Sequence, residues 1–146
     1  MKYSALKPSY RATFGLIERD EVASATLAGV LSLVEQAEQA TAGEDKQAFQ
    51  FLLWKSAADA EYVAFQLSMG HGLGDFEPGD ERAESEAELT LQAARKLLLE
   101  AKSSLQSNPR EAYCSVRKAV TILRKMHLAA ENVSKGRRKS RQKEMG

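Results

Sequence analysis

The residues best suited to acid–base chemistry in this 146-residue chain are its two histidines. His71 lies in the glycine-rich segment 70–79 with Asp75 and Glu77 close by, so a general acid or base could form there. His127 falls on the apolar stripe of a predicted helix, where a hydrogen-bonded histidine at the edge of a core is the more common finding. Because no nucleophile, base and orienting group occur together, an enzyme ranks last among the functional hypotheses.

Metal and thiol chemistry have no stronger support. The histidines and the single cysteine are too few for most zinc sites. The Glu-x-x-His spacing of diiron bundles is absent, because Ser68 and Arg124 stand three residues before the histidines. Cys114 has Lys118 one helical turn away, which favours the thiolate, but no base is placed to activate it. The segment 70–79 lacks the Gly-Lys-Ser/Thr of a phosphate-binding loop. We therefore expect neither a metal nor a cofactor.

Composition indicates an ordinary globular protein. Hydrophobic residues make up 43% and charged residues 28% of the chain, and its length fits one domain. No apolar run approaches the roughly 20 residues of a membrane span, and no signal peptide is indicated. A single cysteine excludes an intramolecular disulfide and is typical of a reducing compartment. These features predict a cytoplasmic protein that does not enter the membrane.

The spacing of the apolar residues predicts an all-α fold, a helical bundle built of two long αα-hairpins. Only three prolines occur, and the stretches between them lack glycine clusters apart from one. The first hairpin is expected over about 20–69, a loop over 70–79 and the second hairpin over about 80–134. All four main helices then belong to one domain, 1–136. A short additional helix from Pro8 is the prediction for the N-terminal part.

Capping residues predict where the helices begin. The first helix is expected to start near Asp20, a good N-cap type. The third is expected to start near Asp80, because several acidic residues follow and suit the positive end of the helix dipole. The start of the fourth is the best determined: Asn108 caps it, Pro109 takes the first helical position and Glu111 completes a capping box.

The predicted second helix, 45–69, is apolar on two opposite faces. One stripe contains Leu53, Ala60 and Leu67, with further apolar residues between them. A helix that is apolar on two faces must be covered on both. It is therefore either central in the fold or carries an interface, and we expect a non-catalytic interaction or assembly protein, as a homo-oligomer or with a protein partner. The predicted interface is the second stripe: Phe51, Trp54, Tyr62, Phe65 and Met69.

Positive charge gathers at the C-terminal end. The chain carries +1 in total, but residues 135–146 carry +5 and the rest −4. Arginines recur every seven residues along the predicted fourth helix and so form one stripe that leads into the tail. The alternative function is therefore an accessory protein that binds the phosphate backbone of RNA or DNA without sequence preference. An acidic protein partner is a third option. The candidate residues are Arg110, Arg117, Lys118, Arg124, Lys125, Lys135, Arg137, Arg138, Lys139, Arg141 and Lys143.

The basic stripe also has a plainer explanation. Charged residues on a helix commonly form a solvated face, and a run of lysines and arginines often serves solubility. The helix is expected to fray near 132–136, and 137–146 to form a flexible basic tail. A binding surface and a solvated face both remain open at this point.

Overall fold

The computed structural model describes the backbone of residues 8–40, 45–73 and 89–145, and the side chains of 18–40, 45–73 and 89–133. Over these ranges the chain is all-α and contains no strand, as predicted. The helices in these ranges are α1 (Pro8–Ala40), α2 (Lys46–His71), α4 (Leu91–Ser104) and α5 (Pro109–Met145).

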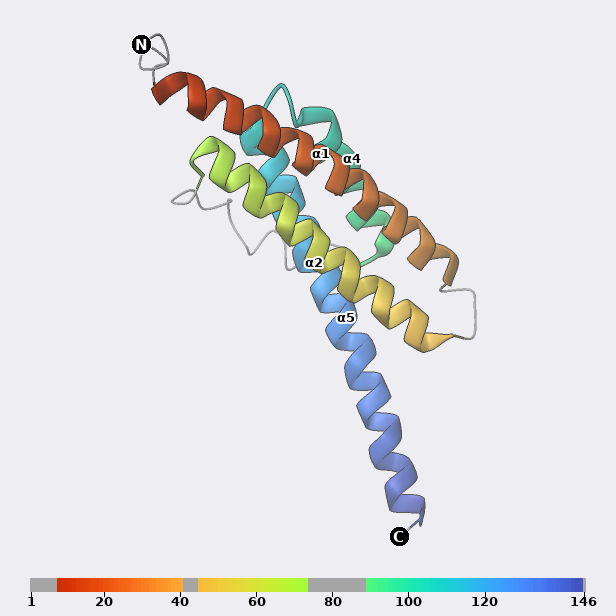
Figure 1. The fold of residues 1–146 in the computed structure, drawn as a ribbon. Helices are drawn as coiled ribbons and strands as arrows, with labels where there is room; N and C mark the ends of the chain where they lie inside the picture. The colour runs from red at the N-terminus through yellow and green to blue at the C-terminus, as the bar shows by residue number, and fades with distance from the viewer. Residues whose placement is uncertain (1–7, 41–44, 74–88, 146) are drawn as a thin grey trace.

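The helices occupy the corners of a bundle in the order α1, α2, α5, α4 (Figure 1). Neighbouring helices run antiparallel. Glu38 near the end of α1 pairs with Arg95 near the start of α4 at 3.3 Å, and the Gln50 amide near the start of α2 donates to the carbonyl of Ala130 on α5 at 3.2 Å. Helices α2 and α4 therefore run in the same direction at diagonal corners. The hairpin of α1 and α2 packs on the hairpin of α4 and α5, and the predicted bundle is confirmed.

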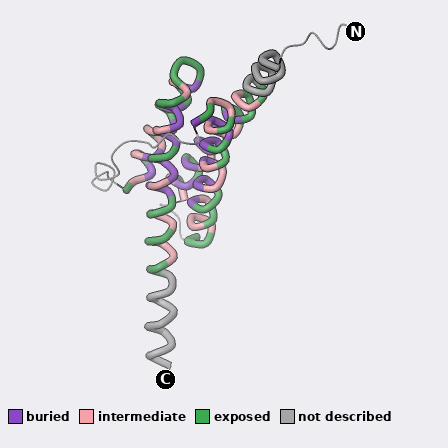
Figure 2. Tube along the Cα trace, turned by 90° about the vertical axis from the view of Figure 1, so that its left-hand side faces the viewer, coloured by how far each residue is buried: buried purple, intermediate pink, exposed green. Residues whose placement is uncertain are grey.

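One hydrophobic core lies between the helices (Figure 2). Each helix contributes residues spaced three and four apart, so that one face is buried. Ser56 is fully buried among them, and its hydroxyl donates to the carbonyl of Leu53 at 3.0 Å, which offsets the cost of burying it. The largest fully buried hydrophobic side chains are Leu27, Val30, Val34, Leu53, Val63, Leu67, Leu98, Val116 and Leu123.

The predicted start of α5 is confirmed in detail. The Asn108 side-chain oxygen accepts from the backbone N–H of Glu111 at 3.2 Å, and the Asn108 amide donates to the Glu111 carboxylate at 3.2 Å. The backbone N–H of Asn108 instead donates to the carbonyl of Ser104 at 2.7 Å. The side chains of Asn108 and Glu111 therefore bind each other. The backbone N–H of Asn108 binds a carbonyl at the end of α4.

Helix α2 has the bounds that its pattern predicts, within two residues. Asp45 caps it by accepting from the N–H of Ala48 at 3.0 Å. Gly72 ends it in the left-handed region, with φ at 66°, and its N–H donates to the carbonyl of Ser68. This is the usual role of glycine at a helix C-terminus.

The sequence predicts one helix from Pro8 and another from Asp20, but the two are a single helix. Helix α1 continues over 33 residues, from Pro8 to Ala40, so Asp20 lies in its interior and caps nothing. Gly15 does not interrupt it. A glycine in a helix interior costs only about 1 kcal/mol relative to alanine, which a long helix tolerates.

The predicted start of the third helix near Asp80 is not where α4 begins. Helix α4 starts at Leu91, and Thr90 caps it by accepting from the N–H of Ala93 at 3.1 Å. Threonine is a good N-cap type, and Thr90 stands directly before Leu91, the first residue of this helix. The segment 74–88, with Asp75, Glu77 and the acidic turns expected there, lies outside the described residues.

Helix α5 continues where fraying was expected. It passes through 132–136 and reaches Met145, projecting beyond the rest of the bundle (Figure 1). Lysine, arginine, glutamine and glutamate are good helix formers, and the single Gly136 does not outweigh them. The segment predicted as a flexible tail is thus the last part of a helix.

Candidate interaction surface

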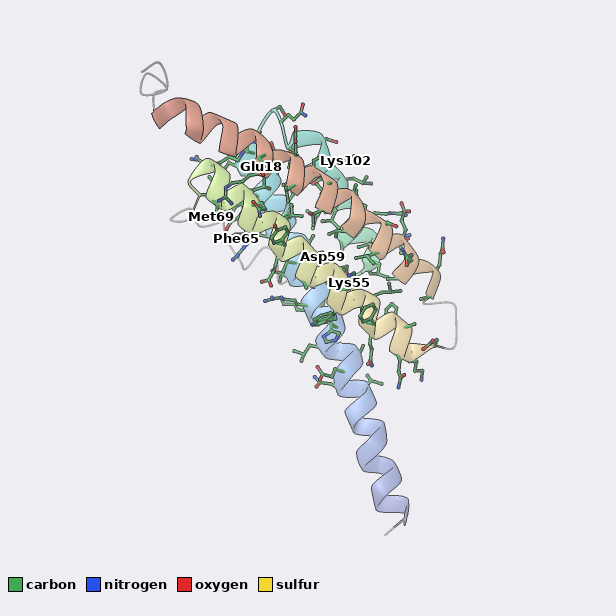
Figure 3. The ribbon with its side chains drawn as sticks, in the orientation of Figure 1. Glu18, Lys55, Asp59, Phe65, Met69 and Lys102 are labelled. Atoms are coloured by element: carbon green, nitrogen blue, oxygen red, sulfur yellow. The ribbon has the colours of Figure 1, made fainter. Side chains whose placement is uncertain are left out.

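The outer face of α2 exposes five large apolar side chains. They are the residues predicted as an interface: Phe51 (55% exposed), Trp54 (55%), Tyr62 (46%), Phe65 (53%) and Met69 (56%). Figure 3 shows Phe65 and Met69 on the outer side of the helix. The opposite stripe of α2 lies in the core. The two-faced pattern of this helix therefore leaves one of its two apolar faces in solvent.

The aromatic residues at the start of this face form a pair. The rings of Phe51 and Trp54 lie with centroids 6.1 Å apart and are tilted by 36°. Aromatic pairs at this separation attract each other beyond the area they bury. The pair makes a broad apolar platform at one end of the outer face, while Phe65 and Met69 form the other end.

Two hollows lie along the groove between α2 and α5. The first, which we call the Phe65 hollow, has a volume of about 440 Å³ and is lined by Glu61, Tyr62, Ala64, Phe65, Ser68, Tyr113 and Arg117. The second, the Trp54 hollow, has about 430 Å³ and is lined by Trp54, Ala57, Ala58, Glu61, Arg124, His127 and Leu128. Each hollow has an aromatic side chain of the outer face on one wall and an arginine on the other.

An ion pair separates the two hollows. The carboxylate of Glu61 binds the guanidinium of Arg124, and Glu61 lines both hollows. Both side chains are about half exposed, so the pair adds little to stability. It does hold the arginine of α5 against α2 at the middle of the groove.

The described residues of the basic stripe are all at the surface: Arg110, Arg117, Lys118, Arg124 and Lys125. Two of the arginines face the groove. Arg117 lies over the ring of Tyr113, 5.9 Å from its centroid, and Arg124 binds Glu61. The side chains of Lys135, Arg137, Arg138, Lys139, Arg141 and Lys143 lie outside the described residues.

The aromatic stripe and two arginines of the basic stripe, Arg117 and Arg124, therefore border one groove. The sequence predicts each stripe but does not place the two side by side. Phe65 and Arg117, which share a hollow, are 52 positions apart. No local pattern signals such a meeting, because it depends on how α2 packs against α5.

The histidines occupy two different places. The Nε2 of His71 lies 2.9 Å from a carboxylate oxygen of Asp20, so the end of α2 is tied to α1. Next to this contact, the guanidinium of Arg19 donates to the side chain of Gln66 at 3.1 Å. His127 is half-buried and lines the Trp54 hollow. Through its contact with Asp20, His71 links the end of α2 to α1.

Three further findings bear on the chemistry of this fold. Among the described residues, no group of three or more His, Cys, Asp or Glu is arranged to hold a metal ion. None of the described helices has the length and apolar character needed to cross a membrane. Cys114 is partly buried on α5.

The chain matches no protein-family model, no curated protein and no solved structure. The fold and the surface together define a class only: an all-α bundle with a solvent-facing aromatic stripe beside a row of arginines.

Proposed function

We propose that this protein is a non-catalytic helical interaction module of the cytoplasm that binds a protein through the outer face of α2. It acts as a homo-oligomer or as a subunit of a larger assembly. The observation that carries the proposal is the exposure of Phe51, Trp54, Tyr62, Phe65 and Met69 along one helix. Half of an aromatic side chain is on the order of 100 Å², and its burial contributes about 2 kcal/mol. A partner therefore gains affinity at each of these positions.

The residue types also support a protein partner. Tryptophan, tyrosine, phenylalanine, methionine and arginine are enriched at protein interfaces, and binding energy concentrates in a few such residues. Trp54 and Phe65 border hollows that can receive side chains, while Arg117 and Arg124 supply charge at the rim. An anchor cluster beside a polar rim is the usual anatomy of a binding site.

Affinity purification from the native host tests this proposal. The variants are Trp54→Ser and Phe65→Ser, and the matched control is Leu99→Ser on α4, a side chain 48% exposed at the diagonal corner of the bundle. We expect the wild-type chain and the control to retain a partner, which includes a second copy of the chain, and the two face variants to lose it. Equal retention by all four chains would refute the proposal.

A second candidate function is binding of RNA or DNA without sequence preference through α5. Two observations favour it: Arg110, Lys118 and Lys125 are exposed, and α5 continues as a helix through a segment with six lysines and arginines. If about five phosphates are contacted, the binding constant falls by several powers of ten per decade of salt.

The two candidates are separable in one further arm of the same purification. Nuclease treatment releases a partner held through nucleic acid but leaves a direct protein contact intact. A double variant, Lys118→Gln with Lys125→Gln, is expected to weaken nucleic-acid binding and to flatten its salt dependence. It leaves the apolar face of α2 unchanged. Binding of RNA and DNA at wild-type strength by this variant and by a chain ending at residue 134 would exclude the second candidate.

A further inference from the structure

The large apolar residues on the outer face of α2 have nearly the same spacing when the helix is read from either end. Reversal about Ala60 exchanges Phe51 with Met69. The same reversal exchanges Ala58 with Tyr62 and brings Trp54 to within one residue of Phe65. A twofold contact between identical chains requires a surface that is complementary to itself. An antiparallel copy of this helix meets that requirement.

Side-chain size supports the same arrangement at the centre of the face. In an antiparallel pair, Ala58 of each copy stands opposite Tyr62 of the other, so a small side chain faces a large one twice. Alternation of large and small residues is what lets two helices interdigitate. Ala58 is partly exposed and lines the Trp54 hollow, so space exists there for the ring. Glu61 stays at the flank in its ion pair with Arg124.

The hollows provide a place for the largest side chain. In this pairing, Trp54 of the second copy comes to the level of Phe65, beside the Phe65 hollow. That hollow has a volume of about 440 Å³, and beside its aromatic and alanine side chains it is lined by Glu61, Ser68 and Arg117. A guanidinium over an indole face adds a cation–π attraction. Because the contact is twofold, it forms at both ends of the interface.

The exposed apolar area of the outer face supplies more than half of what a standard dimer interface buries. The five side chains of the outer face present on the order of 500 Å² of apolar surface per chain. A standard interface buries about 800 Å² per partner. Leu128, which is 56% exposed on α5, and the walls of the hollows supply further area next to the face.

We propose that a second copy of this chain covers the outer face of α2 in an antiparallel, twofold arrangement, with each Trp54 seated in the Phe65 hollow of the other copy. This inference rests on the proposed function and names its partner. It also orients α5, because the two projecting helix ends then leave the dimer in opposite directions.

Sedimentation equilibrium of the full chain measures the association. We expect a dimer for the wild-type chain and for Leu99→Ser, and at least about a 30-fold weaker dimer for Trp54→Ser, as for loss of an interface anchor. Circular dichroism checks that each variant is folded. A wild-type chain that stays monomeric up to about 100 μM would overturn the inference.

Cysteine cross-linking tests the antiparallel geometry. In a Cys114→Ser background, chains with Ala58→Cys are mixed with chains with Tyr62→Cys and oxidised. The antiparallel pair predicts a mixed disulfide dimer and little disulfide dimer of either chain alone. In a parallel pair, each cysteine instead lies opposite the same position of the other chain. Efficient disulfide formation by Ala58→Cys alone would therefore contradict the proposed arrangement.

The failure of this inference is distinguishable from failure of the proposed function. A monomeric wild-type chain whose purified partner is a different protein, lost with Phe65→Ser and kept with Leu99→Ser, overturns self-association and leaves the interaction function standing. A monomeric chain with no partner that depends on the outer face of α2 overturns both.

Discussion

Glu61 on α2 and Arg124 on α5 form an ion pair at the middle of the groove between the two helices. The pair stands where the aromatic stripe of one helix meets the arginine row of the other. It divides the groove into two hollows, each bordered by an aromatic residue and an arginine. The aromatic stripe of α2 and two arginines of the basic stripe, Arg117 and Arg124, thus border the same groove.

Removal of this ion pair is expected to change stability little. Glu61→Gln and Arg124→Gln should each lower the free energy of unfolding by less than about 1 kcal/mol, because exposed pairs are solvated and screened. Urea unfolding of the two single variants and the double variant gives the coupling energy. A coupling well above 1 kcal/mol would mean that the pair contributes more to stability than its exposure predicts.

The neighbouring leucines of α4 give a matched test of the core. Leu98 is fully buried and Leu99 is 48% exposed. Leu98→Ala is expected to cost about 2–5 kcal/mol, through lost burial and a residual cavity. Leu99→Ala is expected to stay within about 0.5 kcal/mol of the wild type. Urea unfolding measures the free energy of unfolding of both variants. Equal decreases would mean that α4 is rotated about its axis and turns a different face to the core.

Replacement of two glycines by alanine should change the stability of the protein in opposite directions. Gly72 ends α2 with φ at 66°, and nothing lies within 4 Å of an added Cβ. Gly72→Ala therefore costs about 1–2 kcal/mol through backbone strain alone. Gly29 lies within α1, also in open space, so Gly29→Ala is expected to add up to about 1 kcal/mol through helix propensity. Thermal unfolding compares the two, and a stabilised Gly72→Ala would contradict the left-handed cap.

The contribution of the α5 cap to stability can be measured by comparing Asn108→Ala with Asn132→Ala, a control on the same helix. Asn108→Ala removes the acceptor for the N–H of Glu111 and should cost about 1 kcal/mol. Asn132 is exposed on the same helix, and Asn132→Ala should be neutral or slightly stabilising because alanine is the better helix former. If both variants lose equal stability by urea unfolding, the cap does not have the role that its geometry indicates.

The sequence by itself determined the features that depend on residues close together in the chain. Periodic apolar residues indicated the helices, and Asn108 with Glu111 located the start of α5. The exposed stripe of α2 was predictable because both of its faces are apolar within one helix. Local signals failed where two of them competed. Asp20 resembled an N-cap, and only the structure shows it inside α1 and bound to His71, 51 residues away.

The tertiary structure decided which faces meet. Phe65 and Arg117 share a hollow, and Glu61 pairs with Arg124, only because α2 and α5 pack antiparallel at one register. That register depends on the fit of core side chains from all four helices. Helical periodicity is a property of a few turns, whereas the packing of two helices depends on the shape of both surfaces at once. The groove, with its aromatic and basic walls, exists only at that level.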